Sequence, residues 1–99
     1  PICDYGVPNC WLSCITLKKN AKVTPLMLIE ALEKENIESR PIWNPMHLQP
    51  YFAKYDFFTD QTEMSVAEDI FRRGVCLPSD TKMTPAQQQC VIDIIKGLF

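Results

Sequence analysis

The signal for a C-terminal helix constrains the fold of this chain more than any other feature of the sequence. Thr84 and Pro85, followed by Gln87, form a capping signal for the start of a helix. The apolar residues after it recur at i, i+3, i+4 and i+7, the spacing of one helix face. They are Val91, Ile94, Ile95 and Leu98. A helix with one apolar stripe needs a second apolar surface to cover it, so this element must pack against another layer.

Similar start signals occur twice earlier in the chain. Thr24 before a proline predicts a helix over Pro25–Glu35, and Asn36 suits the left-handed position that closes a helix. Ser65, with Glu68 three residues later, predicts a capping box at the start of another helix. The sequence therefore predicts three helices, each with one apolar face.

Three short strands supply the surface that these helices need. Trp11–Leu17 is an apolar, β-branched run that predicts a strand covered on both faces, and a second strand is expected just before Ser39. Gly74 ends the preceding helix and leads into a short strand over Val75–Leu77. We predict an α+β fold, a small three-stranded sheet with helices mainly on one face, whose strand order the pattern leaves open.

Composition and charge exclude several classes of protein. A chain of 99 residues makes one domain, and 46% hydrophobic with 22% charged residues is ordinary for a globular protein. Ten basic and twelve acidic residues are interspersed and give a net charge of -2, so we expect no nucleic-acid partner. No apolar run approaches a membrane span or a signal peptide, so we expect no membrane partner and a cytoplasmic location. Because the chain begins at Pro1 instead of Met, we expect it to be a fragment.

The cysteines form an odd set without a CxxC pair, which favours buried thiols in a reducing compartment over a disulfide framework. They are Cys3, Cys10, Cys14, Cys76 and Cys90. One alternative is a metal site made by Cys10, Cys14 and His47, but zinc ligands usually come as two close pairs, and one pair is missing here. A nucleophilic dyad of Cys14 and His47 is the other alternative. A thiol inside an apolar strand is more often an inert small hydrophobe, so we expect no metal site and no dyad.

The segment Ser39–Tyr55 differs from ordinary loop composition. Pro41, Pro45 and Pro50 restrict the residues before them to extended conformations and stiffen the segment, which allows it to aim side chains. The polar and aromatic side chains along it suit an anionic, hydroxyl-rich ligand, with a guanidinium for a phosphate, an amide for hydroxyls and an indole for a flat face. These candidate substrate-binding residues are Arg40, Trp43, His47 and Gln49.

A packing role for the same segment is the alternative. Its apolar residues could fold back on the core, Arg40 could pair with one of the twelve acidic residues, and His47 could bond a backbone carbonyl. Proline-rich apolar loops serve more often as packing devices than as sites. From the chemistry of the residues alone, both interpretations stay open.

A family resemblance bears on this choice. Residues 35–52 (ENIESRPIWNPMHLQPYF), with PNCWLS before them and EDIFRRGVCLPSDTKMTPAQQQCVIDIIK after them, resemble the C-terminal small domain of the DegT/DnrJ/EryC1/StrS family. The members of this family are pyridoxal-phosphate-dependent aminotransferases that act on nucleotide-linked keto-sugars. The resemblance runs from Tyr5 to near the end of the chain, and its Arg-Pro-x-Trp-x-Pro-Met-His-Leu-Gln-Pro string is specific. The matching turn over Cys76–Ser79 is interpreted as structural, because a proline after a short strand fixes the exit of the chain.

The resemblance implies that residues 1–99 are one domain of a fold type I aminotransferase. In such enzymes a larger N-terminal domain holds the cofactor lysine, the aspartate at the pyridine nitrogen and most phosphate contacts. This chain is then expected to contain no catalytic and no cofactor-binding residue, and to be inactive alone. The resemblance assigns the region to the edge of the substrate pocket at a homodimer interface, which favours the substrate role of the four candidate residues. At Asn44 similar sequences often have a basic residue, so a phosphate contact from this position is not expected.

The implied activity is transfer of an amino group from an amino acid, glutamate in the expected case, to a 4-keto-6-deoxy sugar carried on a nucleotide. The product would serve the synthesis of a surface glycan or a glycosylated protein. The alternative function is a stand-alone, non-catalytic binding or interaction module with the same fold. The two differ in whether a lysine-bearing α/β domain precedes Pro1 in the natural polypeptide.

Overall fold

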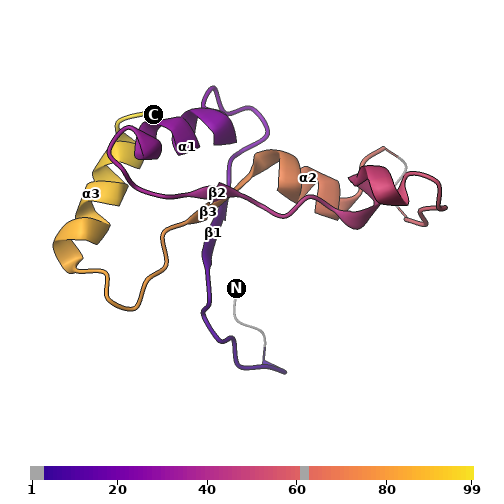
Figure 1. Ribbon diagram of the computed structural model, residues 1–99, viewed down its shortest axis with the longest axis horizontal. Helices are drawn as coiled ribbons and strands as arrows, with labels where there is room; N and C mark the ends of the chain where they lie inside the picture. The colour runs from indigo at the N-terminus through magenta and orange to yellow at the C-terminus, as the bar shows by residue number, and fades with distance from the viewer. Residues whose placement is uncertain (1–3, 61–62) are drawn as a thin grey trace.

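The computed structural model describes residues 4–60 and 63–99, in which three short strands form one antiparallel sheet (Figure 1). β1 spans Ser13–Thr16, β2 spans Arg40–Pro41 and β3 spans Gly74–Leu77. The strand order is β1-β3-β2, so the last strand of the sequence lies in the centre of the sheet. The predicted α+β class and three-stranded sheet are confirmed. Cys3, one of the cysteines discussed above, lies outside the described residues.

Three α-helices and two single-turn 3₁₀ helices complete the described part of the fold. α1 spans Pro25–Glu33, α2 spans Val66–Arg73 and α3 spans Pro85–Lys96. The 3₁₀ helices η1 (Met46–Leu48) and η2 (Pro50–Phe52) lie between β2 and α2. None of the helices among the described residues is both long and apolar enough to cross a lipid bilayer.

The helix starts agree with the sequence signals, with one difference. At α3 the capping box is complete, because Thr84 accepts from the backbone of Gln87 while the Gln87 side chain accepts from the backbone N–H of Thr84. At α2 the Ser65 hydroxyl accepts from the backbone N–H of Glu68 at 3.2 Å. The Glu68 carboxylate is engaged elsewhere and accepts from Arg72 at 2.5 Å. A favourable ion pair thus occupies the side chain that the capping-box signal assigned to the helix start.

The end of α1 shows how far the sequence signal was reliable. The helix ends at Glu33, two residues before the predicted end, and a turn follows. Asn36 adopts a φ of 56°, as the sequence predicted, and the N–H of Ile37 donates to the carbonyl of Leu32 at 3.0 Å. The left-handed closure is therefore confirmed, while the last turn is tighter than an α-helix.

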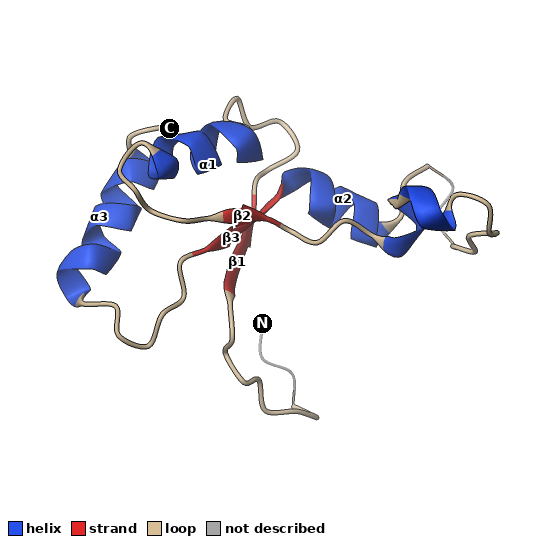
Figure 2. Cartoon of the chain, viewed as in Figure 1, coloured by secondary structure: helices blue, strands red, loops and turns tan. Residues whose placement is uncertain are grey.

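The core lies between the sheet and two of the helices. Three side chains are fully buried, namely Leu28 and Leu32 of α1 and Val75 of β3. They form one cluster with Val91 of α3 and with Leu17, which directly follows β1. α1 and α3 lie on the same side of the sheet, whereas α2, which leads into the start of β3, extends in the opposite direction (Figure 2). Two of the three described helices thus cover one face of the sheet, and neither of them covers the other face.

Two strand predictions are corrected. β1 is shorter than the predicted Trp11–Leu17, and Ser13, Cys14 and Thr16 are exposed, so this strand is not covered on both faces. The physical reason is its place at the edge of the sheet, where only the side chains on the face toward α1 meet the core. The second strand, expected just before Ser39, is instead β2 at Arg40–Pro41, inside the segment that was expected to be a loop, because two residues suffice to pair with β3.

Gly74 joins α2 directly to β3 and is buried. Its φ of −97° and ψ of 151° are those of a strand, so backbone conformation is not the reason for glycine here. A Cβ atom at this position would lie 2.3 Å from Cγ1 of Ile42 and 2.6 Å from the carbonyl oxygen of Ile70. Glycine is required because the neighbouring strand and the last turn of α2 approach the backbone too closely for a side chain.

Candidate functional site

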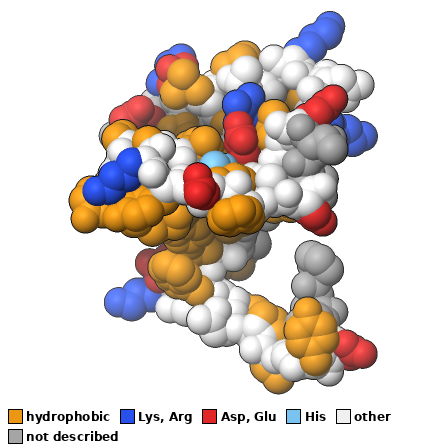
Figure 3. Space-filling model, turned by 90° about the vertical axis from the view of Figure 1, so that its right-hand side faces the viewer, with side chains coloured by type: hydrophobic (Ala, Val, Ile, Leu, Met, Phe, Trp, Pro, Cys, Tyr) orange, Lys and Arg blue, Asp and Glu red, His pale blue; other side chains and the backbone are white. Residues whose placement is uncertain are grey.

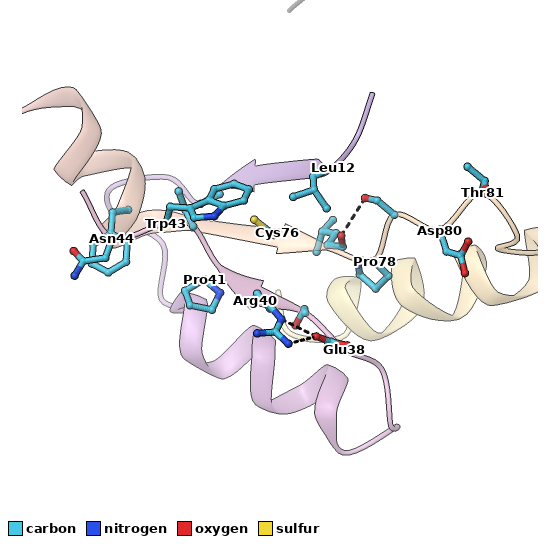
Figure 4. Close-up of a pocket in the computed structure, with 15 residues that line it drawn as sticks. Leu12, Glu38, Arg40, Pro41, Trp43, Asn44, Cys76, Pro78, Asp80 and Thr81 are labelled. Carbon is cyan, nitrogen blue, oxygen red and sulfur yellow. Dashed lines mark hydrogen bonds and ion pairs between the residues drawn. The ribbon is translucent and has the colours of Figure 1, made fainter. Parts of the chain in front are cut away.

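A cavity of about 1070 Å³ opens on the face of the sheet opposite the core (Figure 4). We call it the open-face cavity. One side of the cavity is formed by residues 38–44, which include β2, and another by residues 76–81 at the end of β3. Leu12 and Phe71 complete the lining. Its volume is slightly above the range that is typical of small-molecule pockets, about 300–1,000 Å³.

Strand register determines which side chains reach this cavity. Arg40 of β2 and Cys14 of β1 both pair with Cys76 of β3, one on each side. Paired residues point to the same face of a sheet, and neighbours along a strand point to opposite faces. Since Val75 points into the core, Cys76 and its two partners point to the open face. The rung Cys14–Cys76–Arg40 therefore crosses the sheet at the base of the cavity.

Arg40 is held by an ion pair that is exposed to solvent. Its Nε and Nη2 both lie 2.6 Å from Oε1 of Glu38, and the two side chains are 76% and 72% exposed. The pairing with an acidic residue that the packing alternative expected is therefore present. Exposed pairs of this kind contribute only about 0–1 kcal/mol, so an anionic ligand can compete for the guanidinium at little cost.

Trp43 supplies a flat surface at the rim. Its ring lies 5.6 Å from that of Trp11, measured between centroids, with an angle of 41° between the planes. Both indoles are more than half exposed, at 59% for Trp43 and 66% for Trp11. Exposed aromatic side chains that face a cavity provide large apolar contact area with one polar N–H each, which suits a ring-shaped ligand. Trp11, which was not among the predicted site residues, contacts Trp43 but does not itself line the cavity.

His47 lies away from the open-face cavity. Its ring is stacked on Phe57, with 3.7 Å between centroids and 14° between planes. Its Nε2 atom lies 4.0 Å from Oε2 of Glu68, and the side chains of the two residues are 15% and 17% exposed. The imidazole thus holds the η1 turn against α2, and its role in substrate binding stays a prediction.

Gln49 is also used within its own segment. Its Nε2 donates to the carbonyl oxygen of Asn44 at 3.1 Å and lies 3.6 Å from the sulfur of Met46. These contacts close the turn between residues 44 and 49, and Gln49 does not line the open-face cavity. The four predicted residues are therefore divided into two pairs, of which Arg40 and Trp43 share the cavity. The substrate role of Gln49 likewise stays a prediction.

The surface around η1, η2 and α2 is rich in aromatic groups (Figure 3). Hydrophobic side chains gather there between scattered charged ones, and those exposed include Tyr51, Tyr55, Phe57 and Phe58. The ammonium of Lys54 lies 5.6 Å from the ring centroid of Tyr51 and 5.2 Å from that of Tyr55. Cation–π contacts of this kind hold the two rings in place at the surface.

The cysteines differ from the sequence-based expectation. Cys76 is buried, but Cys10, Cys14 and Cys90 are exposed, so the expectation of buried thiols holds for one of the four described. The Sγ atoms of Cys14 and Cys76 lie 3.6 Å apart. Burial, followed by the contact with Cys14, raises the pKa of the Cys76 thiol to about 11. Cys14 thus lies against another thiol and not against an imidazole.

The described residues offer no metal site, and the open-face cavity lacks the side chain that would attach pyridoxal phosphate. Among residues 4–60 and 63–99, no three His, Cys, Asp or Glu side chains are close enough to hold a metal ion. The residues that line the open-face cavity include no lysine, the side chain that covalent attachment of pyridoxal phosphate requires. The lining of this cavity therefore does not fit this cofactor.

The turn over Cys76–Ser79, which we call the CLPS turn, connects the cavity wall to β1. The Ser79 hydroxyl accepts from the backbone N–H of Ser13 at 2.7 Å and donates to the carbonyl of Leu77 at 3.1 Å. The structural interpretation of this turn is consistent with these bonds, but Pro78 and Ser79 also line the cavity. Leu12 is far in the sequence from Phe71 and the CLPS turn, and no local signal marks them as one site.

The chain is similar in sequence to one protein family and to several curated proteins. The DegT/DnrJ/EryC1/StrS aminotransferase family matches residues 5–96. A relative from Bacillus subtilis, named putative pyridoxal phosphate-dependent aminotransferase EpsN, is 43% identical over 95% of this chain and 24% of its own length. Two proteins named GDP-perosamine synthase are similar to it as well. The one from Vibrio cholerae is 30% identical over 90% of this chain and 23% of its own length. The one from Caulobacter vibrioides is 32% identical over 83% and 21%. The chain thus spans about a quarter of the length of these curated relatives.

Proposed function

Because the chain belongs to the DegT/DnrJ/EryC1/StrS aminotransferase family, we propose that it is the C-terminal small domain of a sugar aminotransferase. The complete enzyme would use pyridoxal phosphate to transfer an amino group from glutamate to a nucleotide-linked 4-keto-6-deoxy sugar, for a surface glycan or glycoprotein. The observation that carries the proposal is the family match over residues 5–96, together with a relative of 43% identity that is named as a putative pyridoxal phosphate-dependent aminotransferase. The names of the two GDP-perosamine synthases support a nucleotide-sugar substrate.

The cofactor belongs to another part of the proposed enzyme. When bound there, pyridoxal phosphate supplies the electron sink for amino transfer. The residues of this chain line the open-face cavity without a lysine, which supports a division of labour in which they bind and orient the sugar. A homodimer and a cytoplasmic location are part of the same proposal.

Within the proposed domain, Arg40 and Trp43 form the wall that contacts the nucleotide sugar. The guanidinium would exchange the Glu38 carboxylate for a phosphate oxygen, and the indole would cover a flat face of the ligand. His47 and Gln49 remain substrate-binding candidates in the wider proposal, and their contacts with Glu68 and Asn44 give them a second role in holding the loop.

The first test is the reading frame upstream of Pro1 and the activity of its product. We expect roughly 250–300 further residues with a lysine-bearing domain, a cofactor domain being larger than this one. The full-length product should aminate a nucleotide-linked keto-sugar with glutamate. The 99-residue chain should show no specific visible absorption with pyridoxal phosphate. A natural polypeptide that starts at Pro1 and binds sugars without catalysis would support the binding module instead.

The second test addresses the cavity. In the full-length protein, Arg40→Ala should raise the KM for the nucleotide sugar by roughly 10-fold or more, because a charge-assisted hydrogen bond contributes about 1.5–3 kcal/mol. Arg72→Ala is the matched control, because Arg72 also pairs with a glutamate but lies outside the cavity. Equal KM values for the two variants would remove Arg40 from the site.

A further inference from the structure

Cys14 and Cys76 are directly opposite each other on the two neighbouring strands β1 and β3. In the same register, the N–H of Leu17 donates to the carbonyl of Arg73 at 2.9 Å, which makes that pair a hydrogen-bonded one. Hydrogen-bonded and non-hydrogen-bonded pairs alternate along an antiparallel ladder. Counting back three residues from Leu17, the two cysteines form a non-hydrogen-bonded pair, the type in which opposite side chains are closest.

The other edge of the sheet supports the same assignment independently. Arg40 is opposite Cys76, and Pro41 is opposite Val75. Pro41 has no N–H to donate, so it fits the non-hydrogen-bonded type of pair opposite Val75. The backbone groups of Cys76 therefore point toward β2, and the side facing Cys14 is free of ladder bonds. The 3.6 Å between the two Sγ atoms agrees with this arrangement.

From this geometry we infer that Cys14 and Cys76 are a redox-active dithiol that a low-molecular-weight disulfide converts into an intramolecular bridge between β1 and β3. Cα atoms in a non-hydrogen-bonded pair are about 4.5 Å apart. Disulfides join Cα atoms about 4.4–6.8 Å apart, so the bridge forms without a shift of either strand. Rotation of the side chains is sufficient to bring the sulfurs from 3.6 Å to bonding distance.

The reaction proceeds in two exchange steps. The exposed Cys14 thiol loses its proton, and its thiolate attacks the small disulfide, forming a mixed disulfide and releasing one small thiolate. Cys76 then loses its proton and attacks the Cys14 sulfur, which breaks the mixed disulfide and releases the second small thiol. Overall, two protein thiols are oxidised to one disulfide, the small disulfide is reduced to two thiols, and both protons leave on those thiols.

The burial of the two cysteines sets their order of reaction. Cys76 is only 7% exposed, and burial raises the pKa of its thiol to about 11, so it is a poor first nucleophile. Once Cys14 holds the mixed disulfide, the adjacent position of Cys76 compensates for its low thiolate fraction. Thiol–disulfide exchange runs in both directions, so an excess of the reduced small thiol restores both cysteines.

Oxidation changes the wall of the open-face cavity. Cys76 lines that cavity next to Arg40 on the same rung, so a bridge withdraws its thiol toward β1. The dithiol follows from strand register alone and does not depend on the proposed aminotransferase function. Its test therefore uses a covalent readout and no enzymatic assay.

The test uses a variant in which Cys3, Cys10 and Cys90 are replaced by serine, leaving the proposed pair. The folded protein is equilibrated in mixtures of oxidised and reduced glutathione, quenched in acid and analysed by intact mass and peptide mapping. We expect a loss of mass equal to two hydrogen atoms, one cross-linked peptide that contains both cysteines, and recovery of both thiols in excess reduced glutathione.

Two single variants in that background serve as controls. With Cys76→Ser, Cys14 should keep one glutathione as a stable mixed disulfide. With Cys14→Ser, the buried Cys76 should react with oxidised glutathione more than 10-fold more slowly than Cys14 does in the Cys76→Ser variant. The inference is overturned if both thiols stay free at every ratio, or if the pair stops at a mixed disulfide on Cys14. If the serine variant does not fold, peptide mapping of the wild-type chain, and of the longest polypeptide its gene encodes, distinguishes the same outcomes.

Discussion

Replacing Gly74 by alanine should destabilise the fold, because this residue lies where α2, β2 and β3 meet. The added Cβ would lie 2.3 Å from Ile42 Cγ1 and 2.6 Å from the Ile70 carbonyl oxygen, both far inside van der Waals contact. The Ile42 side chain can rotate away, but the Ile70 carbonyl belongs to the backbone of α2 and moves only with the helix. Overpacking of this type costs about 1–3 kcal/mol.

The measurement is urea and thermal unfolding followed by far-ultraviolet circular dichroism. For a domain of this size, each kcal/mol lowers Tm by roughly 4–8 °C, so the expected loss is easily resolved. A second variant, Ile42→Ala, separates the two contacts. In that background Gly74→Ala should keep part of its penalty, because the close approach to the Ile70 carbonyl remains.

Gly97→Ala is the matched control. Gly97 ends α3 with φ −66° and ψ −12°, and a Cβ there would meet the Asp93 and Ile94 carbonyl oxygens at 3.4 and 3.5 Å. These are ordinary contacts, so the substitution should raise stability by about 0.4–1 kcal/mol through the unfolded state. If Gly74→Ala proves as stable as Gly97→Ala, the inference that the α2–β3 junction is too closely packed for a side chain is wrong.

Three further predictions concern the caps, the core and pH. Thr84→Ala removes the capping box of α3 and should cost about 0.5–2 kcal/mol in urea unfolding, whereas a loss below the error of the midpoint would contradict the cap. Leu28→Ala should cost about 2–5 kcal/mol, while Leu26→Ala, 63% exposed on the same helix, should change stability by less than about 0.5 kcal/mol. The hydrogen bond from Arg73, with its charge, lowers the pKa of Asp69 in the folded state. The stability from this pair is therefore present above the ordinary aspartate value near 3.9 and is lost as pH falls below about 4. Asp69→Asn should flatten that part of the pH profile of the urea midpoint, and an unchanged profile would contradict the assignment.

The local elements could be predicted because their signals lie within a few residues of each other. Thr84 with Gln87, and Asn36 at the end of α1, act through bonds to their own neighbours, and the structure has them as expected. A second strand was predicted, but its position at Arg40–Pro41 could not be, since a two-residue strand has no periodicity and exists only through pairing with β3. The exposure of β1 could not be predicted either, because an apolar run does not reveal whether it lies at the edge of a sheet.

The candidate site was predicted in part for the same reason. Arg40 and Trp43 are near each other in the sequence, and both line the open-face cavity. His47 and Gln49 are equally near, but the η1 and η2 turns direct their side chains to Phe57 and Asn44. The contribution of Cys76 depends on the register of three strands, which only the tertiary structure supplies.

The direct connection between α2 and β3 has a mechanical consequence. No residue separates Arg73 from Gly74, and the Arg73 guanidinium also donates to the carbonyl of Leu17 just beyond β1. The helix and the strand therefore cannot turn relative to each other without breaking the bond between Arg73 and Leu17 and opening the close packing around Gly74. A shift of the outer end of α2, where Glu68 lies 4.0 Å from His47, would therefore act on the middle strand, which is paired with both edge strands.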